Sequence, residues 1–549
     1  MRATLGRTAS GAPFPTVRQR FAAAVAGSPR LVGWLGPLAV SAFALLLRLW
    51  DIHQPDEITF DETYYAKDAY SLQEFGYVRQ FKESADEKIN AGDLSGLYAE
   101  GPAQIVHPEV GKWMLALGIR AFGMDPVGWR VGAAVTGALT VLVLCRMVRR
   151  LSGSTLVGCL AGLLLALDGL HLVMSRLALL DGFLAFWLVC AAACLVADRD
   201  WGRQRLLALH ERAGATVGAP VVGFGPVRGM LLRPWRLAAG VCFGLACGSK
   251  WNGVVVLAAF GLLTLAWDAG ARRALGVSAA WLRAAVADAV PALFSLVGVA
   301  FVVYVATWTG WLVHHDLMQD TYAKSYSWGG YVEEEPGSAI GETGQALRDL
   351  WNYHHQVWTF HTVDVVRTTS DDPHPYESDP RGWLLVNRPV GMDLQGDVPP
   401  GQLGCTAPEG STCLRQVLAL GNPVLWWVGA AALLVALWRW VARRDWRFGV
   451  PLVGVAATWL PWFRYDDRSI FSFYAVATIP FTCAALALVL GLLLGRADAN
   501  RRRRAGGAAV VGVVVVAVAL SALFFWPIWT DQLIPHSEWE QRMWLDRWI

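Results

Sequence analysis

Residues 31–50 read LVGWLGPLAVSAFALLLRLW, an apolar run in which Arg48 is the one charged residue. A helix of about 20 apolar residues is long enough to cross the hydrocarbon core of a bilayer, so this run predicts a first membrane span over residues 32–50. Ten more apolar runs follow, and we expect eleven spans in all. The ten lie at residues 128–148, 153–171, 180–197, 236–249, 252–269, 288–309, 421–440, 449–463, 470–494 and 507–529.

The composition of the whole chain indicates the same class of protein. Of its 549 residues, 55% are hydrophobic and 17% are charged, whereas soluble proteins carry about 25% charged residues. We therefore expect an all-α polytopic membrane protein. The formal net charge of +3 is too small to indicate a nucleic-acid partner. Residues 1–30 are polar and basic, and no small-residue cleavage site follows, so we expect the first span to be an uncleaved anchor.

Arginines cluster in every second loop between the expected spans. These clusters lie in the N-terminal segment and at residues 146–150, 198–235, 272–283, 439–447 and 496–504. Because basic loops stay in the cytoplasm, we expect a cytoplasmic segment over 1–31 and an external C-terminus. The membrane core then covers 32–309, including an external loop at 51–127. A second external loop covers 310–420, and C-terminal spans cover 421–549.

The two long external loops carry further local signals. Apolar residues between Val110 and Ala121 recur on one helical face, which predicts an amphipathic helix lying on the membrane surface. The 310–420 loop is rich in aromatic residues, Gly and Pro, and a loop of this length is usually functional or disordered. Its aromatic content favours order. Cys405 and Cys413 lie in this loop, where an external location would permit a disulfide.

Charged side chains at the span ends gather on the expected external side. The adjacent acids Asp61 and Glu62 follow the first span, within the stretch FDETYY at residues 60–65. The residues Arg176, Asp181, Lys250 and Arg468 lie at three other outer boundaries. Charge at a membrane boundary is costly, so its convergence on one face predicts a site. A carboxylate can take a proton from a hydroxyl, and Arg or Lys can hold a phosphate, which suits transfer from a lipid phosphate.

Each cluster also has a purely structural interpretation. Asp61 and Glu62 could be ordinary solvated loop charges. Arg176 and Asp181 flank a turn and could form a structural ion pair. Lys250 could be an interfacial residue that extends its ammonium group to water. Taken singly, these interpretations weigh as much as the functional ones, and the shared face favours a site.

Several stretches together resemble the protein O-mannosyltransferase family. They are FDETYY at 60–65, HPEVGK at 107–112, SRLALLD at 175–181, KWNG at 250–253, HPYESDPRGW at 374–383 with Arg388-Pro389 after it, and the aromatic run with Ile-Pro-Phe at 468–481. The matches follow in order from the first span to the tenth. Glu109 stands where the family usually has Pro. The 310–420 loop is too short for the β-trefoil module of eukaryotic members, so the chain resembles the actinobacterial branch.

The resemblance implies a GT-C glycosyltransferase of the bacterial plasma membrane. It would transfer mannose, with inversion, from polyprenyl-phosphate mannose to Ser or Thr hydroxyls of secreted proteins at the outer face. Asp61 is implied as the base, and Glu62 would position donor or acceptor. Arg176, Lys250 and Arg468 are the candidates to bind the donor phosphate, with Arg176 the best matched. Candidate substrate- and lipid-binding residues are His107, Lys112, Asp181, Asn252, His374, Tyr376, Ser378, Trp383 and Arg388.

The resemblance also bears on cofactors, partners and alternatives. No metal is expected to be obligatory, because Arg and Lys can stabilise a leaving phosphate; a divalent metal is the alternative. The implied partners are the lipid donor, Ser/Thr-rich secreted proteins and the Sec translocon. An aminoarabinosyltransferase-like enzyme that modifies an envelope glycolipid would share the fold and the first acid. A transporter for lipid-linked sugar is a further alternative, although no internal repeat is visible.

Overall fold

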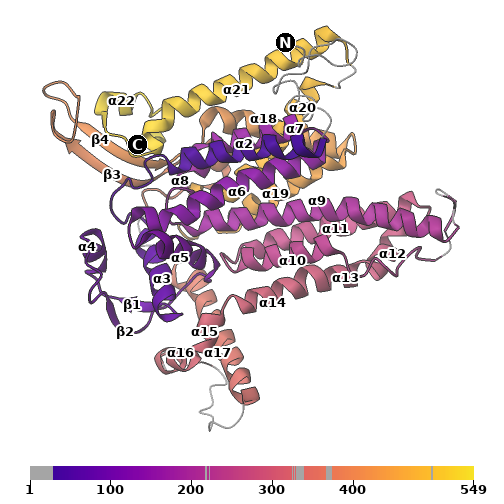
Figure 1. The fold of residues 1–549 in the computed structure, drawn as a ribbon, viewed down its shortest axis with the longest axis horizontal. Helices are drawn as coiled ribbons and strands as arrows, with labels where there is room; N and C mark the ends of the chain where they lie inside the picture. Colours follow the sequence, from indigo (N-terminus) through magenta and orange to yellow (C-terminus); the bar gives the residue numbers. More distant parts are fainter. Residues whose placement is uncertain are drawn as a thin grey trace, which may run out of the picture.

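The computed structural model describes residues 29–549 except 215, 217–218, 222, 324, 327, 329–338, 367–373, 466 and 496–498. Most of the expected N-terminal cytoplasmic segment, residues 1–28, therefore lies outside the described residues. The described chain is dominated by helices (Figure 1), in agreement with the expected class. Two small antiparallel sheets, which the sequence did not predict, are added to them.

Within the part of the chain that the structure describes, six helical runs are long and apolar enough to cross a membrane. They are α6 (Pro126–Ser152), α9 (Leu180–Arg212), α11 (Gly253–Ala274), the run Ala289–Ala306 that contains α13, η1 and α14, α18 (Pro423–Val441) and α21 (Arg501–Trp529). Shorter apolar helices are Gly33–Leu49 within α2 (Pro29–Leu49), α7 (Thr155–Ala166), α10 (Pro234–Cys247) and α20 (Ile479–Leu494). The expected span at 449–463 contains α19 (Gly449–Trp459) and the 3-10 turn η5 (Leu460–Arg464). The count of eleven spans stays a prediction.

Several expected spans differ from the helices at one end, most of all the span expected at 180–197, which continues as α9 to Arg212. The span expected at 153–171 ends as α7 at Ala166, and the short helix α8 (Gly169–Val173) follows. Asp168 separates them, because its side chain accepts a hydrogen bond from the backbone N–H of His171 and so caps α8. The span expected at 470–494 begins as α20 only at Ile479, where Pro480 occupies the first turn.

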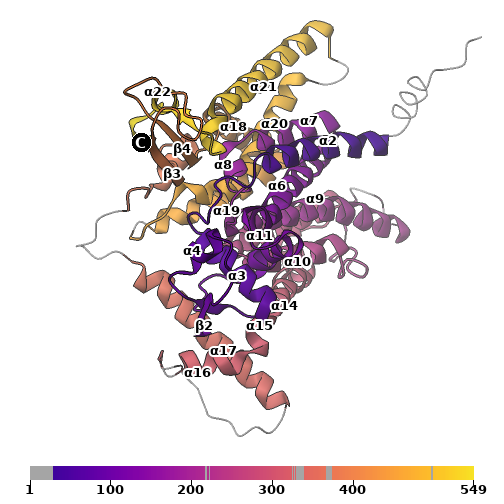
Figure 2. The ribbon, with the colours of Figure 1, turned by 60° about the vertical axis from the view of Figure 1, so that its left-hand side comes forward.

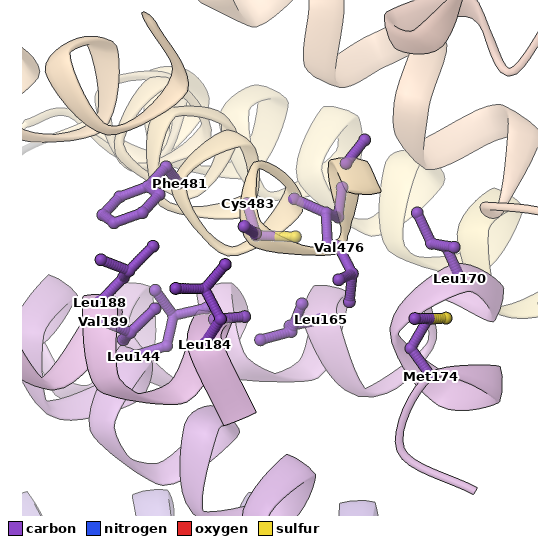
Figure 3. Close-up of a cluster of buried hydrophobic side chains, with 14 of the residues drawn as sticks. Leu144, Leu165, Leu170, Met174, Leu184, Leu188, Val189, Val476, Phe481 and Cys483 are labelled. Carbon is purple, nitrogen blue, oxygen red and sulfur yellow. The ribbon is translucent and has the colours of Figure 1, made fainter. Parts of the chain in front are cut away.

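The helices pack around a dry apolar core (Figure 3). Leu144 of α6, Leu165 of α7 and Leu188 of α9 face Phe481 and Cys483 of α20. All five side chains are buried. Burial of this kind fixes α20 against the helices from the first half of the chain, and so brings the two halves of the sequence together.

Buried ion pairs fix α10 between α9 and α11. Arg233, directly before α10, binds Asp198 of α9 at 2.7 Å and Asp268 of α11 at 2.8 Å. Arg236 of α10 binds the same two carboxylates at 3.1 and 2.7 Å. Each charge is therefore paired twice, as buried charge requires. The network holds the start of α10, and the turn at the other end of this helix carries Lys250.

The elements of the two long loops gather at one end of the helix bundle (Figures 1 and 2). The 51–127 loop forms α3 (Glu62–Phe75), α4 (Ala85–Asn90), α5 (Val110–Phe122) and a hairpin of β1 (Arg79–Phe81) and β2 (Tyr98–Pro102). The expected helix over 110–121 is confirmed as α5, and Trp113 and Leu117 on its apolar face are exposed. Which side of the membrane this end faces stays a prediction.

The 310–420 loop is not a separate unit. It contains α15 (Thr309–Val313), α16 (His315–Tyr322), α17 (Ala339–Thr359), the π-turn η2 (Phe360–Asp364), the 3-10 turn η3 (Pro380–Leu385), β3 (Val390–Val398) and β4 (Cys413–Ala419). The C-terminal strand β5 (Ile534–Pro535) pairs with β4, which completes a sheet in the order β3-β4-β5. Cys405 and Cys413 form a disulfide beside it.

Candidate active site

A cavity of about 260 Å³ lies where the turn between α10 and α11 meets α9, α17 and the segment before α20. Its wall combines charged, polar and aromatic side chains. These are His107, Asp181, Lys250, Trp251, Asn252, Trp358, His361, Thr362, Thr458, Trp462, Tyr465, Arg468 and Tyr474, with aliphatic residues of α9, α11, α19 and the segment before α20. Such a mixture suits a ligand with both a polar and an apolar part.

Lys250 supplies one positive charge to this cavity. It lies in the turn after α10, and its Nζ is 2.7 Å from Asp181 Oδ2 at the start of α9. Its ammonium group also lies 5.3 Å from the centre of the Tyr474 ring. The Lys250 side chain is 12% exposed and that of Asp181 is 6% exposed, so the pair is largely desolvated and held in one position.

Arg468 supplies a second positive charge. It follows α19 in the chain, and its Nη1 donates to the main-chain oxygen of His361 at 3.2 Å. A β-bridge to Val366 fixes its backbone. Its buried Nε has no hydrogen-bond partner among the described residues. A guanidinium with an unused donor at a cavity wall is suited to an anionic ligand.

Uncharged polar groups complete the wall. The side-chain oxygen of Asn252 is buried without a hydrogen-bond partner among the described residues, so it can accept from a ligand hydroxyl. The rings of His107 and His361 stack at 5.4 Å. Burial is the main reason why the pKa of His107 lies well below its usual value, so His107 is neutral at pH 7.

Asp61 is not among the residues that line this cavity, but the charges of two that do, Lys250 and Asp181, act on its carboxylate. Its backbone setting is unusual. Phe60 before it has a φ of 49°, in a region that non-glycine residues seldom occupy, and the Phe60 ring packs edge-on against Phe473 at 5.8 Å. The Asp61 carboxylate makes no capping hydrogen bond to α3. Its pKa is raised to about 6, mainly by burial; Lys250 opposes this rise and Asp181 adds to it. A carboxylate with this pKa is ionised at pH 7 and can take up a proton.

Glu62, the neighbour of Asp61, points into the protein. Its carboxylate receives Arg130 Nε at 2.9 Å and Nη2 at 2.7 Å, and the backbone N–H of Ala178 at 2.8 Å. Both charged side chains are 0% exposed. Arg130 also donates to the main-chain oxygens of Ile52 and Pro55. The two adjacent acids therefore face different surroundings. The Glu62 carboxylate already accepts hydrogen bonds from Arg130 and Ala178.

Two family models match the chain. Residues 346–548 match the C-terminal four TMM region of protein-O-mannosyltransferase, and residues 120–212 match dolichyl-phosphate-mannose-protein mannosyltransferase. The chain is also 35% identical to the polyprenol-phosphate-mannose–protein mannosyltransferase of Mycolicibacterium smegmatis, over 94% of this chain and 93% of the relative. It belongs to the protein O-mannosyltransferase family. A relative of the same name from Corynebacterium glutamicum is 33% identical, with 93% and 92% of the two chains covered.

The fold agrees with this membership. A structure of the Saccharomyces cerevisiae protein O-mannosyltransferase Pmt1-Pmt2 complex bound to the sugar donor matches with a TM-score of 0.66 and 15% identity. The match covers 96% of this chain and 94% of the other. The expected GT-C fold is therefore confirmed. An arabinosyl transferase from Pseudomonas aeruginosa, which acts with an undecaprenyl phosphate sugar, is 29% identical over only 126 residues.

Five of the residues expected from the family pattern meet in the cavity wall, namely His107, Asp181, Lys250, Asn252 and Arg468. Arg176 does not join them. Its Nη1 donates to the main-chain oxygens of Arg48 and Trp50, and its Nη2 to that of Asp51 at 3.0 Å. The side chain is 4% exposed. Main-chain oxygens at and just after the end of α2 therefore accept three of its hydrogen bonds. Its expected role as the best-matched phosphate ligand stays a prediction.

The other expected binding residues also make internal contacts. Lys112 is 1% exposed and pairs with Asp68 of α3 at 2.9 Å. Trp383 donates to Ser378 Oγ at 2.9 Å, and Arg388 donates to the main-chain oxygens of Pro375 and Ile549. His374 and Tyr376 pack beside this loop, with the His374 ring 5.1 Å from Phe471. The stretch 374–388 thus contacts the C-terminal residue Ile549 through Arg388 and packs against the segment before α20 through His374.

The structure adds residues to which the sequence assigned no role of their own. Trp251, His361 and Tyr474 line the cavity, and Arg130 anchors Glu62. Arg130 had a readable signal, because it is a charged residue inside an apolar span. His361 had none, since it belongs to a stretch without a motif and reaches the site only through the packing of α17 and η2.

Proposed function

We propose that the protein transfers mannose from polyprenyl-phosphate mannose to Ser or Thr hydroxyls of proteins. The observation that carries the proposal is the position of Lys250 and Arg468 in one cavity wall, beside an acid, Asp61, with a pKa of about 6. The relatives' names specify a polyprenol-phosphate mannose donor and a protein acceptor. Together these findings support a site with a place for a phosphate and a base for a hydroxyl.

In this proposal the donor phosphate lies between Lys250 and Arg468. The oxygen of the acceptor hydroxyl attacks the anomeric carbon, its bond forms as the bond from that carbon to the phosphate oxygen breaks, and Asp61 takes the hydroxyl proton. Polyprenyl phosphate leaves with the bonding electrons, and its added negative charge is stabilised by the two cations. Attack opposite the leaving group inverts the anomeric configuration. The unpartnered oxygen of Asn252 accepts a hydrogen bond from a sugar hydroxyl.

Glu62 has a different role in this proposal from the one expected. It holds the loop before α3 through Arg130 and Ala178, so that Asp61 is positioned by the backbone of its own neighbour. Arg176 acts in the same way on the chain that leaves α2. Both are positioning residues here. Lys250 and Arg468 remain as the phosphate-binding pair, and they can supply the positive charge without an obligatory metal.

We place the catalytic end of the molecule at the outer face of the plasma membrane. Support comes from the alternation of basic loops along the sequence and from the position of both long loops at one end of the bundle. The Cys405–Cys413 disulfide lies at this end, in keeping with an oxidising compartment. Acceptors are then chains that emerge from the Sec translocon, and association with it is part of the proposal.

The test is reconstitution with defined substrates. Purified protein receives synthetic polyprenyl-phosphate mannose and a Ser/Thr-rich peptide, and mass spectrometry detects a gain of one hexose on the peptide. The expected result is mannosyl peptide from wild type and none from Asp61→Asn. Transfer to an envelope glycolipid in place of the peptide would overturn the protein-acceptor assignment. Movement of intact donor across a liposome membrane without any product would instead indicate a transporter.

A further inference from the structure

Three side chains from distant parts of the sequence form a hydrogen-bonded chain beside the candidate site. Trp251, in the turn after α10, donates through Nε1 to Tyr304 Oη of α14 at 2.7 Å. Tyr304 Oη lies 2.6 Å from His354 Nε2 of α17. His354 Nδ1 lies 2.7 Å from the main-chain oxygen of Leu350. The chain thus connects the α10–α11 turn to a helix of the 310–420 loop.

The partners determine the direction of each hydrogen bond. A main-chain oxygen only accepts, so His354 Nδ1 carries the proton and Nε2 of the neutral ring accepts. Tyr304 therefore donates to His354 and accepts from Trp251. Burial lowers the pKa of His354, which agrees with a neutral ring. Every polar hydrogen on the Trp251, Tyr304 and His354 side chains has a partner in this arrangement.

The Trp251 ring forms part of two cavity walls. One is the polar cavity with Lys250 and Arg468. The other is an apolar cavity of about 510 Å³ between α11, α14 and α17. The ring is partly buried against the aromatic cluster that contains Trp308 and Tyr353, and it meets the His361 ring edge-on at 6.1 Å. Its orientation toward α17 is set by the hydrogen bond at Nε1 and by stacking with His354, whose ring lies 5.5 Å away at an angle of 17°.

Both ends of this chain are firmly attached. On the α17 side, Tyr353 Oη accepts from the backbone N–H of Ile105 and donates to its oxygen, at 2.7 and 3.0 Å. On the other side, Trp251 lies between Lys250 and Asn252, which line the polar cavity together with it. A change in the ring of Trp251 is therefore transmitted to the proposed phosphate- and sugar-binding groups through the shared backbone of a short turn.

We infer that Tyr304 and His354 are positioning residues that fix Trp251, and with it the turn that presents Lys250 and Asn252 to the lipid-linked sugar. The inference rests on the proposed function for the identity of the ligand. It assigns to α17 a direct part in setting donor affinity, beyond covering the site. Because the residues positioned in this way are the proposed phosphate- and sugar-binding groups Lys250 and Asn252, the inference assigns the effect to the donor.

The test uses a matched pair of substitutions at His354. In His354→Gln the side-chain amide reaches the position of Nε2 and can still accept from Tyr304, whereas the shorter amide of His354→Asn reaches only the position of Nδ1. Tyr304→Phe removes the middle hydroxyl and keeps the ring. His355→Asn, on the exposed neighbour in α17, is the control. Steady-state kinetics with donor and peptide varied separately, thermal unfolding, and native mass spectrometry of bound polyprenyl phosphate are measured for each.

The expected result is that His354→Asn and Tyr304→Phe raise the KM for the donor and the Kd for polyprenyl phosphate by about fivefold, the value of one hydrogen bond. We expect kcat and the KM for the peptide to stay within about twofold, and His354→Gln and His355→Asn to resemble wild type. Equal effects of Gln and Asn at position 354 would overturn the inference. So would a lower Tm with unchanged donor KM and Kd, since this is the signature of a structural role alone.

The binding measurement separates this inference from the proposed function. If wild type makes no mannosyl peptide but polyprenyl phosphate binds, and binding weakens in His354→Asn and not in His354→Gln, the proposed reaction fails and the positioning chain stands. If wild type is active and polyprenyl phosphate binds all variants equally, the reaction stands and the positioning chain fails.

Discussion

Arg130 and Glu62 face each other as a fully buried, two-pronged ion pair, with Nε–Oε1 and Nη2–Oε2 distances of 2.9 and 2.7 Å. The pair connects α6 to Glu62, the first residue of α3, which directly follows Asp61 in the sequence. Arg130 also holds main-chain oxygens of Ile52 and Pro55. One cation therefore organises the whole connection between the first span and the proposed base.

Removal of one partner of this pair is expected to be strongly destabilising. Glu62→Gln leaves the buried guanidinium of Arg130 without its counter-charge, and the loss of stability should be about 3–5 kcal/mol. Thermal unfolding in detergent, followed with a thiol-reactive or tryptophan probe, measures it as a lower Tm. Glu74→Gln, at an exposed position on the same helix, is the control. An unchanged Tm in Glu62→Gln would show that the pair contributes little to the fold.

The proposed base makes turnover depend on pH. Asp61 must be ionised to accept a proton, and its pKa is raised to about 6. We expect kcat/KM to rise with pH through about 6 and to level off above 7. Asp61→Asn should reduce kcat by about a hundredfold to ten-thousandfold. The measurement is the pH profile of peptide mannosylation, with Asp56→Asn in the same loop as the control. A profile that is flat from pH 5 to 8 would exclude Asp61 as the titrating base.

Asp61→Asn should also make the protein more stable at neutral pH. The folded-state pKa lies above the ordinary value of 3.8, so the folded protein holds this proton more tightly, and the acid costs stability as pH rises from about 4 to about 6. The substitution removes that cost, which amounts to about 3 kcal/mol at pH 7.5. A higher Tm together with lost turnover would separate a catalytic defect from a folding defect, whereas a lower Tm would contradict this account.

Arg176 and Lys250 should respond differently to truncation. Lys250→Ala removes a cation from the cavity wall, and we expect the Kd for polyprenyl phosphate to rise by about tenfold to a hundredfold, as for a charged hydrogen bond. Arg176→Ala instead leaves three main-chain oxygens at and just after the end of α2 without this donor, so Tm should fall while the Kd changes little. Titration of polyprenyl phosphate by native mass spectrometry checks both. If Arg176→Ala raises the Kd for polyprenyl phosphate more than Lys250→Ala does, Arg176 binds the phosphate.

Much of the fold could be read from hydropathy because the bilayer demands long apolar helices. The ends of two spans could not, since they depend on single residues: Asp168 caps a separate short helix, and Pro480 delays the start of α20. The pairing of β4 with β5 could not be predicted from the sequence either. Its two strands lie more than a hundred residues apart, and β5 has only two residues.

At the site, residue type and position identified the charges but not their partners. Lys250 and Arg176 look equivalent in the sequence, as basic residues at the outer ends of spans. The structure separates them, because Lys250 faces a cavity beside Asp181 whereas main-chain oxygens surround Arg176. The acids Asp61 and Glu62 divide in the same way. Whether a charged side chain finds its hydrogen-bonding partners inside the protein depends on packing between distant segments. The local sequence does not determine this packing.

Glu109, the residue that stands where the family usually has Pro, introduces a further titrating group. It is 1% exposed, and its main polar contact is a donor, Trp113 Nε1, at 3.3 Å. Burial raises its pKa to about 7 from an ordinary 4.5, against the effect of Lys112. Since the folded-state pKa is the higher one, the stability that depends on this group is present below about pH 4.5 and is lost as pH rises to about 7.

Glu109→Gln should therefore remove part of the pH dependence of stability. At pH 8 we expect the free energy of unfolding of the variant to exceed that of wild type by about 3 kcal/mol, because a buried carboxylate no longer has to ionise. At pH 5 the two should differ little, since wild-type Glu109 is then largely protonated in the folded state. Thermal unfolding at the two pH values measures this, with Glu83→Gln, an exposed residue of the same loop, as the control. If the difference in Tm between variant and wild type is the same at pH 5 and pH 8, Glu109 does not titrate in this range.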